Sequence, residues 1–415
     1  MSDSELATLL FSIVLLLGAA HGFGYFFERF GMPRVVGEIV GGIVLGPSLF
    51  GLLSPAGQAL VFSGFPEQAK LLSTFYWFGL ALLMFASGFH LRGHFSTGER
   101  GFVGLLVAAA AAIPLAVGWA VPDIFDLTSY WGTNHNPLAF QLIIAASVAV
   151  TSIPVISKIF TDLGLLDTKF ARTVLAVATI EDVILWVVIA IATALASGKA
   201  VGPAGLAQSA GIAILFLALA LTLGSLLVRL ASGWHFNLVM KSSRSGYLLA
   251  ICFTFAALAS LLHVNVVFGA LAAGIVVAAL PEEKFGKARE QVTDVARGFF
   301  VPLYFALVGI KINLPHDFDL WLTLAFLAGT SVVKMACVFL ASLAGRRSLF
   351  SSFNFALALN TRGGPGIVLG SLAFGLGLID ARLFTTMILT ALMTSLASGA
   401  WFAALVERKI SVDRA

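Results

Sequence analysis

Charged residues are scarce in this sequence. Lys, Arg, Asp and Glu together make up 11% of its 415 residues, whereas soluble domains carry about 25%. Hydrophobic residues account for 59% and gather in apolar runs of about 18 residues or more, each long enough to cross a hydrocarbon core of about 30 Å. The composition therefore excludes a soluble protein and predicts an all-α integral membrane protein with no stretch left for a soluble domain.

Several common motifs are also missing. Cys252 and Cys337 lie within apolar runs and lack metal-ligand or redox spacing, so we expect no cofactor and no resident metal. The glycines of "FGLGLI" follow no predicted strand, which excludes a nucleotide-binding fingerprint. The net charge of +4 comes from bases clustered between the apolar runs, so we expect a lipid bilayer and no nucleic acid as a partner. The first apolar run follows acids and has no cleavage site, which predicts a retained first helix.

The apolar runs predict about thirteen transmembrane helices. His263 and Asn265 form the only polar break between the eighth and ninth runs, so the count depends on this break. The predicted helices are residues 6–27, 35–53, 71–90, 101–121, 138–158, 171–196, 205–231, 246–262, 264–280, 292–312, 319–344, 350–377 and 383–405.

The basic residues indicate how the chain is oriented. Nineteen of the 25 Lys and Arg residues lie in connections on one side of the predicted membrane, and four lie on the other. Short cytoplasmic connections hold an excess of bases. This bias predicts an N-terminus outside, a cytoplasmic C-terminus and an odd number of crossings.

Three charges lie deep within apolar runs, namely Glu181, Asp182 and Lys334. An Asp or Lys at the centre of a membrane helix costs about 2.5–3.5 kcal/mol, so these side chains need partners. Glu181 follows Lys169 by 12 residues and Lys334 precedes Arg346 by 12, which places both roughly 18 Å from the cytoplasmic helix ends. The shared depth predicts an ion pair between Glu181 and Lys334.

Asp182 is then left without this partner. Adjacent residues on a helix point about 100° apart, so the pairing of Glu181 leaves Asp182 facing a water-filled cavity. A carboxylate in such a place holds either a proton or a small cation, and this competition is the chemistry of an exchanger. The alternative interpretation is a buried polar cluster that only stabilises helix packing.

Two predicted helices are interrupted in mid-span. Pro154 breaks the run 138–158, and Gly363, Gly364 and Pro365 break the run 350–377, because proline removes a backbone donor and disfavours helix before it. The two runs are an odd number of crossings apart, so they enter from opposite faces as an inverted repeat does. Their breaks can cross near the midplane, where Arg362 would neutralise the carbonyl ends of the half-helices.

Five stretches, in this order, resemble those of the monovalent cation:proton antiporter-2 family, which includes bacterial sodium/proton antiporters and potassium efflux antiporters. The resemblance covers nearly the whole chain, and its specificity lies in the combination of motifs. The stretches are "MPRVVGEIVGGIVLGPSLFG", "TSIPVISKIFTDLGLLDTKFARTVLAVATIEDV", "GFFVPLYFALVGIKINL", "TSVVKMACVFLASLAG" and "NTRGGPG".

The resemblance implies a sodium/proton antiporter-like fold with inverted repeats and two crossed discontinuous helices. It implies a homodimer in the cell (inner) membrane that works by elevator-type alternating access. The implied parts are a dimerisation panel at residues 1–97 and 246–315, a transport core at 98–200 and 316–415, and a linker helix at 201–245.

The resemblance also implies roles for individual residues. Asp182 is similar to the essential ion-binding carboxylate of the family and Lys334 to the lysine that pairs with the preceding acid, here Glu181. Thr151 and Ser152 resemble the crossover residues that help to coordinate the ion. An acid often follows the second crossover in the family, but this chain has Gly364 and Pro365 there, so the role of that acid does not transfer.

The favoured function is exchange of Na+ for H+, and a K+/H+ antiporter is the related alternative. Potassium efflux members often have Gln where this chain has Glu181, which favours sodium. An ion channel would show a repeated pore motif, and an intramembrane aspartyl protease would carry catalytic acids on two helices, so neither an ion channel nor an enzyme is expected. Stoichiometry and regulation stay open at this point.

Overall fold

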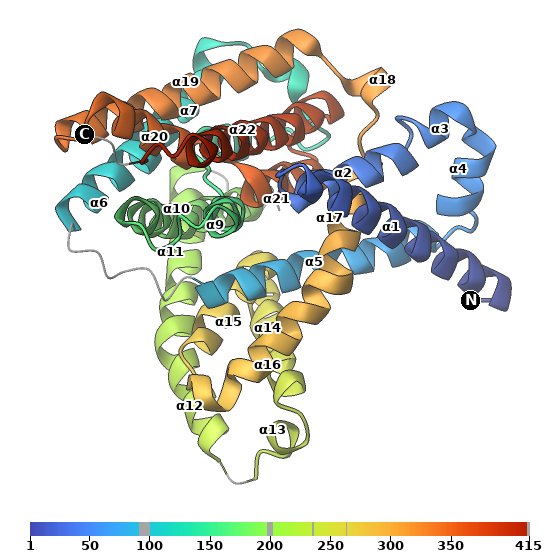
Figure 1. Ribbon diagram of the computed structural model, residues 1–415. Helices are drawn as coiled ribbons and strands as arrows, with labels where there is room; N and C mark the ends of the chain where they lie inside the picture. The colour runs from blue at the N-terminus through green and yellow to red at the C-terminus, as the bar shows by residue number, and fades with distance from the viewer. Residues whose placement is uncertain (91–99, 197–201, 235, 263, 413–415) are drawn as a thin grey trace. The chain divides into compact units, whose positions relative to one another are not determined.

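The computed structural model describes residues 1–90, 100–196, 202–234, 236–262 and 264–412, and within these ranges the chain is helical (Figure 1). The only β-type pairing among them is an isolated bridge between Trp131 and Ile379. The α-helices are α1 (Asp3–Arg29), α2 (Arg34–Leu45), α3 (Phe50–Leu53), α4 (Pro55–Phe62), α5 (Gln68–His90), α6 (Arg100–Val107), α7 (Ile113–Ile124), α8 (Pro137–Ala149), α9 (Ile153–Asp162), α10 (Lys169–Ala196), α11 (Gly202–Leu219), α12 (Ser225–Gly233), α13 (Leu238–Ser242), α14 (Arg244–Leu261), α15 (Val266–Ala278), α16 (Glu282–Val295), α17 (Val301–Ile310), α18 (Leu314–Asp317), α19 (Leu320–Ala344), α20 (Leu349–Leu359), α21 (Gly363–Gly375) and α22 (Ala381–Glu407).

Four shorter helical segments have another hydrogen-bonding pattern. Three of them are π-helical turns that continue neighbouring α-helices, and one is a 3₁₀ turn. They are η1 (Ala108–Ala112), η2 (Thr128–Tyr130), η3 (Ala220–Gly224) and η4 (Ala296–Phe300), with η2 the 3₁₀ turn.

Eleven helical segments among the described residues are long and apolar enough to cross a membrane, so the protein is a multi-pass membrane protein. The two other predicted runs contain the shorter helix α15 and the pair α20 and α21. The predicted break at His263 lies outside the described residues, but Asn265 begins α15 by accepting a hydrogen bond from Val267 N at 2.8 Å. The count of thirteen crossings stays a prediction.

Some helix boundaries differ from the sequence prediction. The predicted run 292–312 begins ten residues late, because α16 already starts at Glu282 and continues through η4 into α17. The charged residues of α16 hid its apolar face, on which Phe285, Ala288 and Val292 are buried. The short helices α4, α13 and α18 were not predicted.

Contacts within the chain divide it into two units. The first unit comprises residues 1–23, 38–93 and 197–311, and the second comprises residues 24–37, 94–196 and 312–415. The roles of panel, core and linker that the resemblance implies for parts of the chain stay predictions.

Small residues hold the helices of the first unit close together. Gly42 on α2 lies directly against the backbone of Ala306 on α17, and Gly309 on α17 lies against the backbone of Ile39. A side chain at either glycine would overlap a neighbouring backbone, which cannot move aside as a flexible side chain can. Close approach through small residues is typical of membrane helices, where no hydrophobic effect drives helices together.

The second unit contains both interrupted helices. The helix α10 packs against α8, α9 and α20, while α22 packs against α9, α19 and α21, and α9, α10, α21 and α22 can be followed in Figure 1. Phe160 and Phe402 from α9 and α22 pack edge to face at 5.5 Å between ring centroids, and Phe170 and Phe355 join them. This aromatic cluster is buried.

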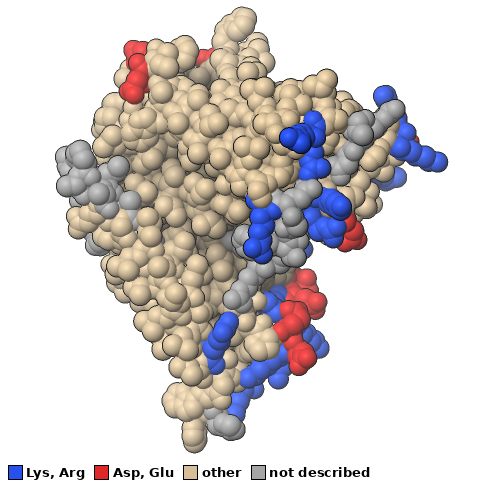
Figure 2. All heavy atoms as spheres, turned by 90° about the vertical axis from the view of Figure 1, so that its left-hand side faces the viewer, with Lys and Arg blue, Asp and Glu red and all other residues tan. Residues whose placement is uncertain are grey.

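The outer surface is largely uncharged. In Figure 2 most of the surface facing the viewer belongs to residues other than Lys, Arg, Asp and Glu. Large apolar side chains are strongly exposed, among them Phe11 at 55%, Trp321 at 80% and Leu340 at 63%. In a membrane such exposed side chains contact lipid tails rather than water, so their exposure carries no hydrophobic cost.

The glycine contact between α2 and α17 gives a stability test. We expect Gly42→Ala to lower the free energy of unfolding by about 1–3 kcal/mol, because the added methyl group overlaps the backbone at Ala306. Thermal unfolding in detergent measures the change. Gly18→Ala on α1 is the matched control, since nothing lies within 4 Å of its added Cβ; equal melting temperatures for the two variants would contradict the proposed close packing.

Candidate functional site

The two interrupted helices of the second unit each contain a short non-helical stretch. The first helix ends at Ala149 and resumes at Ile153, and the second ends at Leu359 and resumes at Gly363. Pro154 at the start of α9 has no backbone N–H to donate. Gly363 has a φ of +32°, and an added Cβ would lie 2.7 Å from Ser152 Oγ, so this position requires glycine.

The two non-helical stretches touch each other. Ser152 N donates a hydrogen bond of 2.6 Å to Thr361 O. Thr151 Oγ1 donates one of 2.5 Å to Leu359 O, a carbonyl in the last turn of α20. The predicted crossing of the interrupted helices is therefore present, and it brings the C-terminal ends of α8 and α20 to the same place.

Lys334 on α19 contacts both the crossing and α10. Its side chain is fully buried, and its ammonium group donates to Ala149 O at the end of α8, to Thr151 Oγ1 at 2.7 Å and to Glu181 Oε1 at 3.1 Å. An ammonium group has three donors, so every one of them has an acceptor. The ion pair predicted between Glu181 and Lys334 is present, and it links α19 to α10.

Arg362 provides the second buried positive charge and is only 2% exposed. Its Nη1 donates to Ser147 O in the last turn of α8, and its Nη2 donates to Asn360 Oδ1 at 3.2 Å. Each helix C-terminus carries roughly half a negative charge on its unpaired carbonyl groups. Arg362 thus binds a carbonyl group at the end of α8, as predicted, but beside the end of α20 it binds the side chain of Asn360 rather than a carbonyl group.

Hydroxyl groups satisfy the N-terminal ends of the other two half-helices. Ser152 Oγ accepts a hydrogen bond from Val155 N at 3.4 Å and so begins α9. At α21, Arg362 N donates to Thr394 Oγ1 at 3.3 Å and Gly363 N donates to Ser395 Oγ at 3.2 Å. These hydroxyl groups of α22 supply the acceptors at the start of α21.

Sequence reasoning missed these α22 residues and Asn360. Thr390, Thr394 and Ser398 recur at intervals of four in the apolar run 383–405, which places them on one face of the helix. Ser398 Oγ also accepts a hydrogen bond of 2.7 Å from Thr361 Oγ1. The regular spacing of buried hydroxyl groups is the signal that could have identified this face.

Glu181 and Asp182 lie side by side on α10, and both are buried, at 3% and 5% exposure. Glu181 bonds through Oε1 to Lys334, while its Oε2 and Asp182 Oδ1 have no hydrogen-bond partner among the described residues. No ion pair of Asp182 occurs within the described part of the chain either. Glu181 is therefore bonded to Lys334 on α19, whereas the carboxylate of Asp182 is available to bind another ligand.

Thr151 and Ser152 use their side chains within the crossing. Thr151 Oγ1 accepts from Lys334 and donates to Leu359 O, and Ser152 Oγ caps α9. Their direct contact with an ion stays a prediction. Groups of three or more His, Cys, Asp or Glu side chains that could hold a metal do not occur in the described ranges.

The sequence matches one protein family over nearly its whole length. The family described as "Sodium/hydrogen exchanger, transmembrane" matches residues 12–408.

Curated relatives share a quarter or more of their aligned residues with this chain. The Na(+)/H(+) antiporter NhaS4 of Synechocystis sp. is 28% identical over 414 residues, which cover 95% of this chain and 96% of that protein. Cation/H(+) antiporter 18 of Arabidopsis thaliana is 25% identical over 407 residues, which cover 95% of this chain but 48% of the plant protein. The chain thus spans about half the length of that plant relative.

The fold is similar to that of a solved archaeal protein. The sodium proton antiporter MjNhaP1 from Methanocaldococcus jannaschii superposes with a TM-score of 0.65 at 15% sequence identity, covering 97% of this chain and 99% of that one.

The buried ion pair can be tested through stability. We expect Lys334→Ala to lower the free energy of unfolding by about 3–5 kcal/mol, because Glu181 and Ala149 O would lose their buried partner. Thermal unfolding in detergent measures the loss. The control is Lys158→Ala, whose ion pair with Glu28 is about 40% exposed and is worth about 1 kcal/mol or less.

The double variant Glu181→Gln/Lys334→Met sharpens this test. It removes both charges, so it should be more stable than Lys334→Ala alone. A Lys334→Ala protein that melts at the wild-type temperature would contradict a structural role for the pair.

Proposed function

Because the chain belongs to the sodium/hydrogen exchanger family, we propose that it exchanges a monovalent cation for protons across a membrane. The family consists of transporters rather than enzymes, and this protein is not an enzyme. The observation that carries the proposal is the buried Asp182, which has no partner in the described structure, next to a Glu181 that is paired with Lys334 through Oε1.

Asp182 is the proposed carrier. A carboxylate holds a proton through one covalent O–H bond or a cation through its negative charge, and the bound proton removes that charge. Since Lys334 is saturated by Glu181, Thr151 and Ala149 O, its ammonium group does not compete with an incoming cation for Asp182. Proton and cation therefore displace each other at one carboxylate, which couples their movements in opposite directions.

The crossing serves to keep charged groups inside the membrane. Lys334 and Arg362 donate to carbonyl groups at the end of α8, and Thr151 Oγ1 donates to Leu359 O at the end of α20. Hydroxyl groups satisfy the N-termini of α9 and α21. Non-helical backbone at membrane depth is tolerated where it lines protein or water. In this proposal Thr151 and Ser152 offer backbone oxygens to the cation, and their side chains hold the crossing in shape.

Sodium is the proposed cation, and potassium is the alternative. Glu181 is the acid that pairs with Lys334. An acid at this position corresponds to the sodium-type arrangement of the monovalent cation:proton antiporter-2 family, to which we assign the chain. The related proteins named above include antiporters for Na+ and for cations in general, which supports cation exchange and leaves the choice of ion to experiment.

The same proposal includes how the protein moves. The parts 98–200 and 316–415 act as the transport core that carries the ion, and the parts 1–97 and 246–315 act as the panel through which two chains form a homodimer, with 201–245 as linker. Alternating access is of the elevator type. The protein lies in the cell inner membrane with its N-terminus outside and its C-terminus in the cytoplasm, as the excess of Lys and Arg on one side favours.

Removal of the carrier charge is the direct test. In everted vesicles energised by a proton gradient, Asp182→Asn should abolish the cation-induced recovery of a pH-sensitive dye, because an amide neither binds a proton nor neutralises a cation. Asp167→Asn is the control, since Asp167 is an exposed acid in the turn after α9 and should leave exchange unchanged. Full activity of Asp182→Asn would exclude Asp182 as the carrier.

Ion choice is tested in the same vesicles. Dye recovery is measured as a function of Na+ and of K+ concentration at constant pH. We expect half-maximal recovery at a concentration at least tenfold lower for Na+ than for K+. The reverse order would assign the protein to potassium/proton exchange while leaving Asp182 as the carrier.

A further inference from the structure

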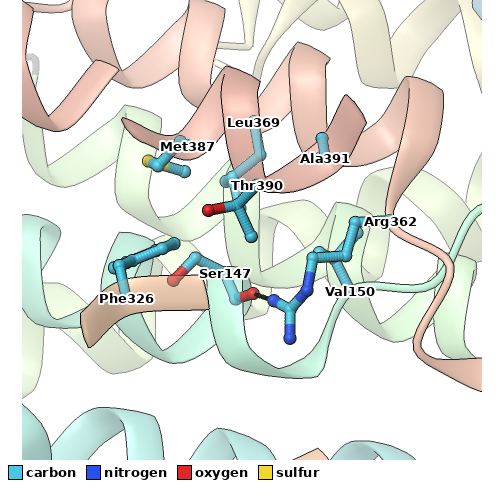
Figure 3. A pocket seen from close by; sticks show the side chains of 9 residues that line it. Ser147, Val150, Phe326, Arg362, Leu369, Met387, Thr390 and Ala391 are labelled. Carbon is cyan, nitrogen blue, oxygen red and sulfur yellow. Dashed lines mark hydrogen bonds between the residues drawn. The ribbon is translucent and has the colours of Figure 1, made fainter. Parts of the chain in front are cut away.

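A small cavity lies inside the second unit, beside the crossing but away from the acidic pair. It is lined by α8, α19, α21 and α22, with Ser147, Arg362, Gly366 and Thr390 among its lining residues. Figure 3 shows the guanidinium group of Arg362 and the side chain of Thr390 next to Ser147 at this cavity. The cavity volume is ≈ 10 Å³, which is about the room that one water molecule needs.

Two polar atoms of the lining residues have no protein partner. Arg362 Nε and Thr390 Oγ1 make no hydrogen bond with any described residue. Both atoms are fully buried, and the exposed fractions of the two residues are 2% for Arg362 and 1% for Thr390. The other nitrogens of the Arg362 guanidinium group donate to Ser147 O and Asn360 Oδ1. Each unsatisfied buried polar group costs about 1–3 kcal/mol, so a ligand that bonds to both would be strongly held.

Charge and size both favour a neutral ligand. The positive charge of Arg362 already faces the C-terminal end of α8, which carries roughly half a negative charge, and the amide oxygen of Asn360. Lys334 is balanced by Glu181. A chloride ion would add an uncompensated charge and is larger than the water-sized space, so an anion is disfavoured.

We propose that this cavity binds one water molecule. The water accepts the hydrogen bond of Arg362 Nε–H and bonds to Thr390 Oγ1. Ser147 Oγ donates to Ile144 O at 2.6 Å and keeps a lone pair for a third bond. Three bonds are typical of a buried water, and they would hold the guanidinium group against the end of α8. The inference is independent of ion exchange, since it uses no group that we assign to the cation.

The first test replaces Gly366, which lines the cavity. An alanine Cβ there would lie 3.5 Å from Ala391 Cβ and 3.3 Å from Arg362 Cβ, which would have to shift by a few tenths of an ångström, and it takes up space in the cavity. The matched control is Gly370 on the same helix, where the Cβ would meet Met387 Cβ at 3.4 Å and Ile388 Cδ1 at 3.5 Å without lining the cavity. Both changes favour helix formation equally.

Thermal unfolding in detergent then separates a filled cavity from an empty one. With the water in place, Gly366→Ala displaces it and should melt roughly 2 °C or more below Gly370→Ala. Equal melting temperatures, or a higher one for Gly366→Ala, would overturn the proposal, because filling an empty cavity stabilises a protein.

The second test replaces hydroxyl groups of α22 with a methyl group of the same shape. We expect Thr390→Val to melt roughly 2 °C or more below wild type, because Thr390 loses its bond to the water. The control is Thr385→Val, since Thr385 is also fully buried with an unpartnered Oγ1 but does not line the cavity, and its melting temperature should stay unchanged or rise. A Thr390→Val protein that is as stable as wild type would contradict the water.

The third measurement identifies the ligand. An experimental density map should contain a peak within about 2.6–3.2 Å of both Arg362 Nε and Thr390 Oγ1, and replacing chloride by gluconate should leave the melting temperature unchanged. A chloride-dependent melting temperature would assign the site to an anion and refute the water. None of these measurements requires transport, so this inference and the proposed exchange can fail separately.

Discussion

Lys334 brings a positive charge among apolar helices, and three acceptors around its ammonium group make this burial tolerable. They come from the end of α8, from the non-helical stretch after it and from α10. The Lys334 side chain thus donates to a carbonyl group at the end of α8, binds the hydroxyl group of Thr151 and pairs with the carboxylate of Glu181. Removal of this charge would leave Glu181 and Ala149 O without a partner in a medium that offers little water.

The four half-helix ends at the crossing have partners of opposite partial charge: the carbonyl ends meet hydrogen-bond donors, and the amide ends meet acceptors. The carbonyl end of α8 faces the buried cations Lys334 and Arg362, and the carbonyl end of α20 accepts a hydrogen bond from Thr151 Oγ1. The amide ends of α9 and α21 face hydroxyl oxygens. With these ends satisfied inside the protein, the charge of Asp182 needs no role in holding the crossing together. In the proposed function, this unpaired carboxylate is the group that alternates between a proton and a cation.

Much of the fold could be predicted from the chain, because a membrane helix needs an apolar run of known length. The interruptions were also readable, since Pro154 and the segment from Gly363 to Pro365 act on their own backbone. The Glu181 and Lys334 contact followed from equal depth. The start of α16 was missed because its charged residues conceal a buried face, and the helix count near His263 depended on one short polar break.

The sequence by itself determined that the chain is helical, that it lies in a membrane, where its two helices break and that Glu181, Asp182 and Lys334 are buried, because each of these properties depends on nearby residues and on the cost of charge in lipid. Only the tertiary structure decided that Thr394 and Ser395 cap α21, that Asn360 and Ser147 bind Arg362, and that a cavity remains beside Thr390. These partners are far apart in the chain and chemically ordinary. Their pairing arises from how helices pack, which the local pattern of residues does not encode.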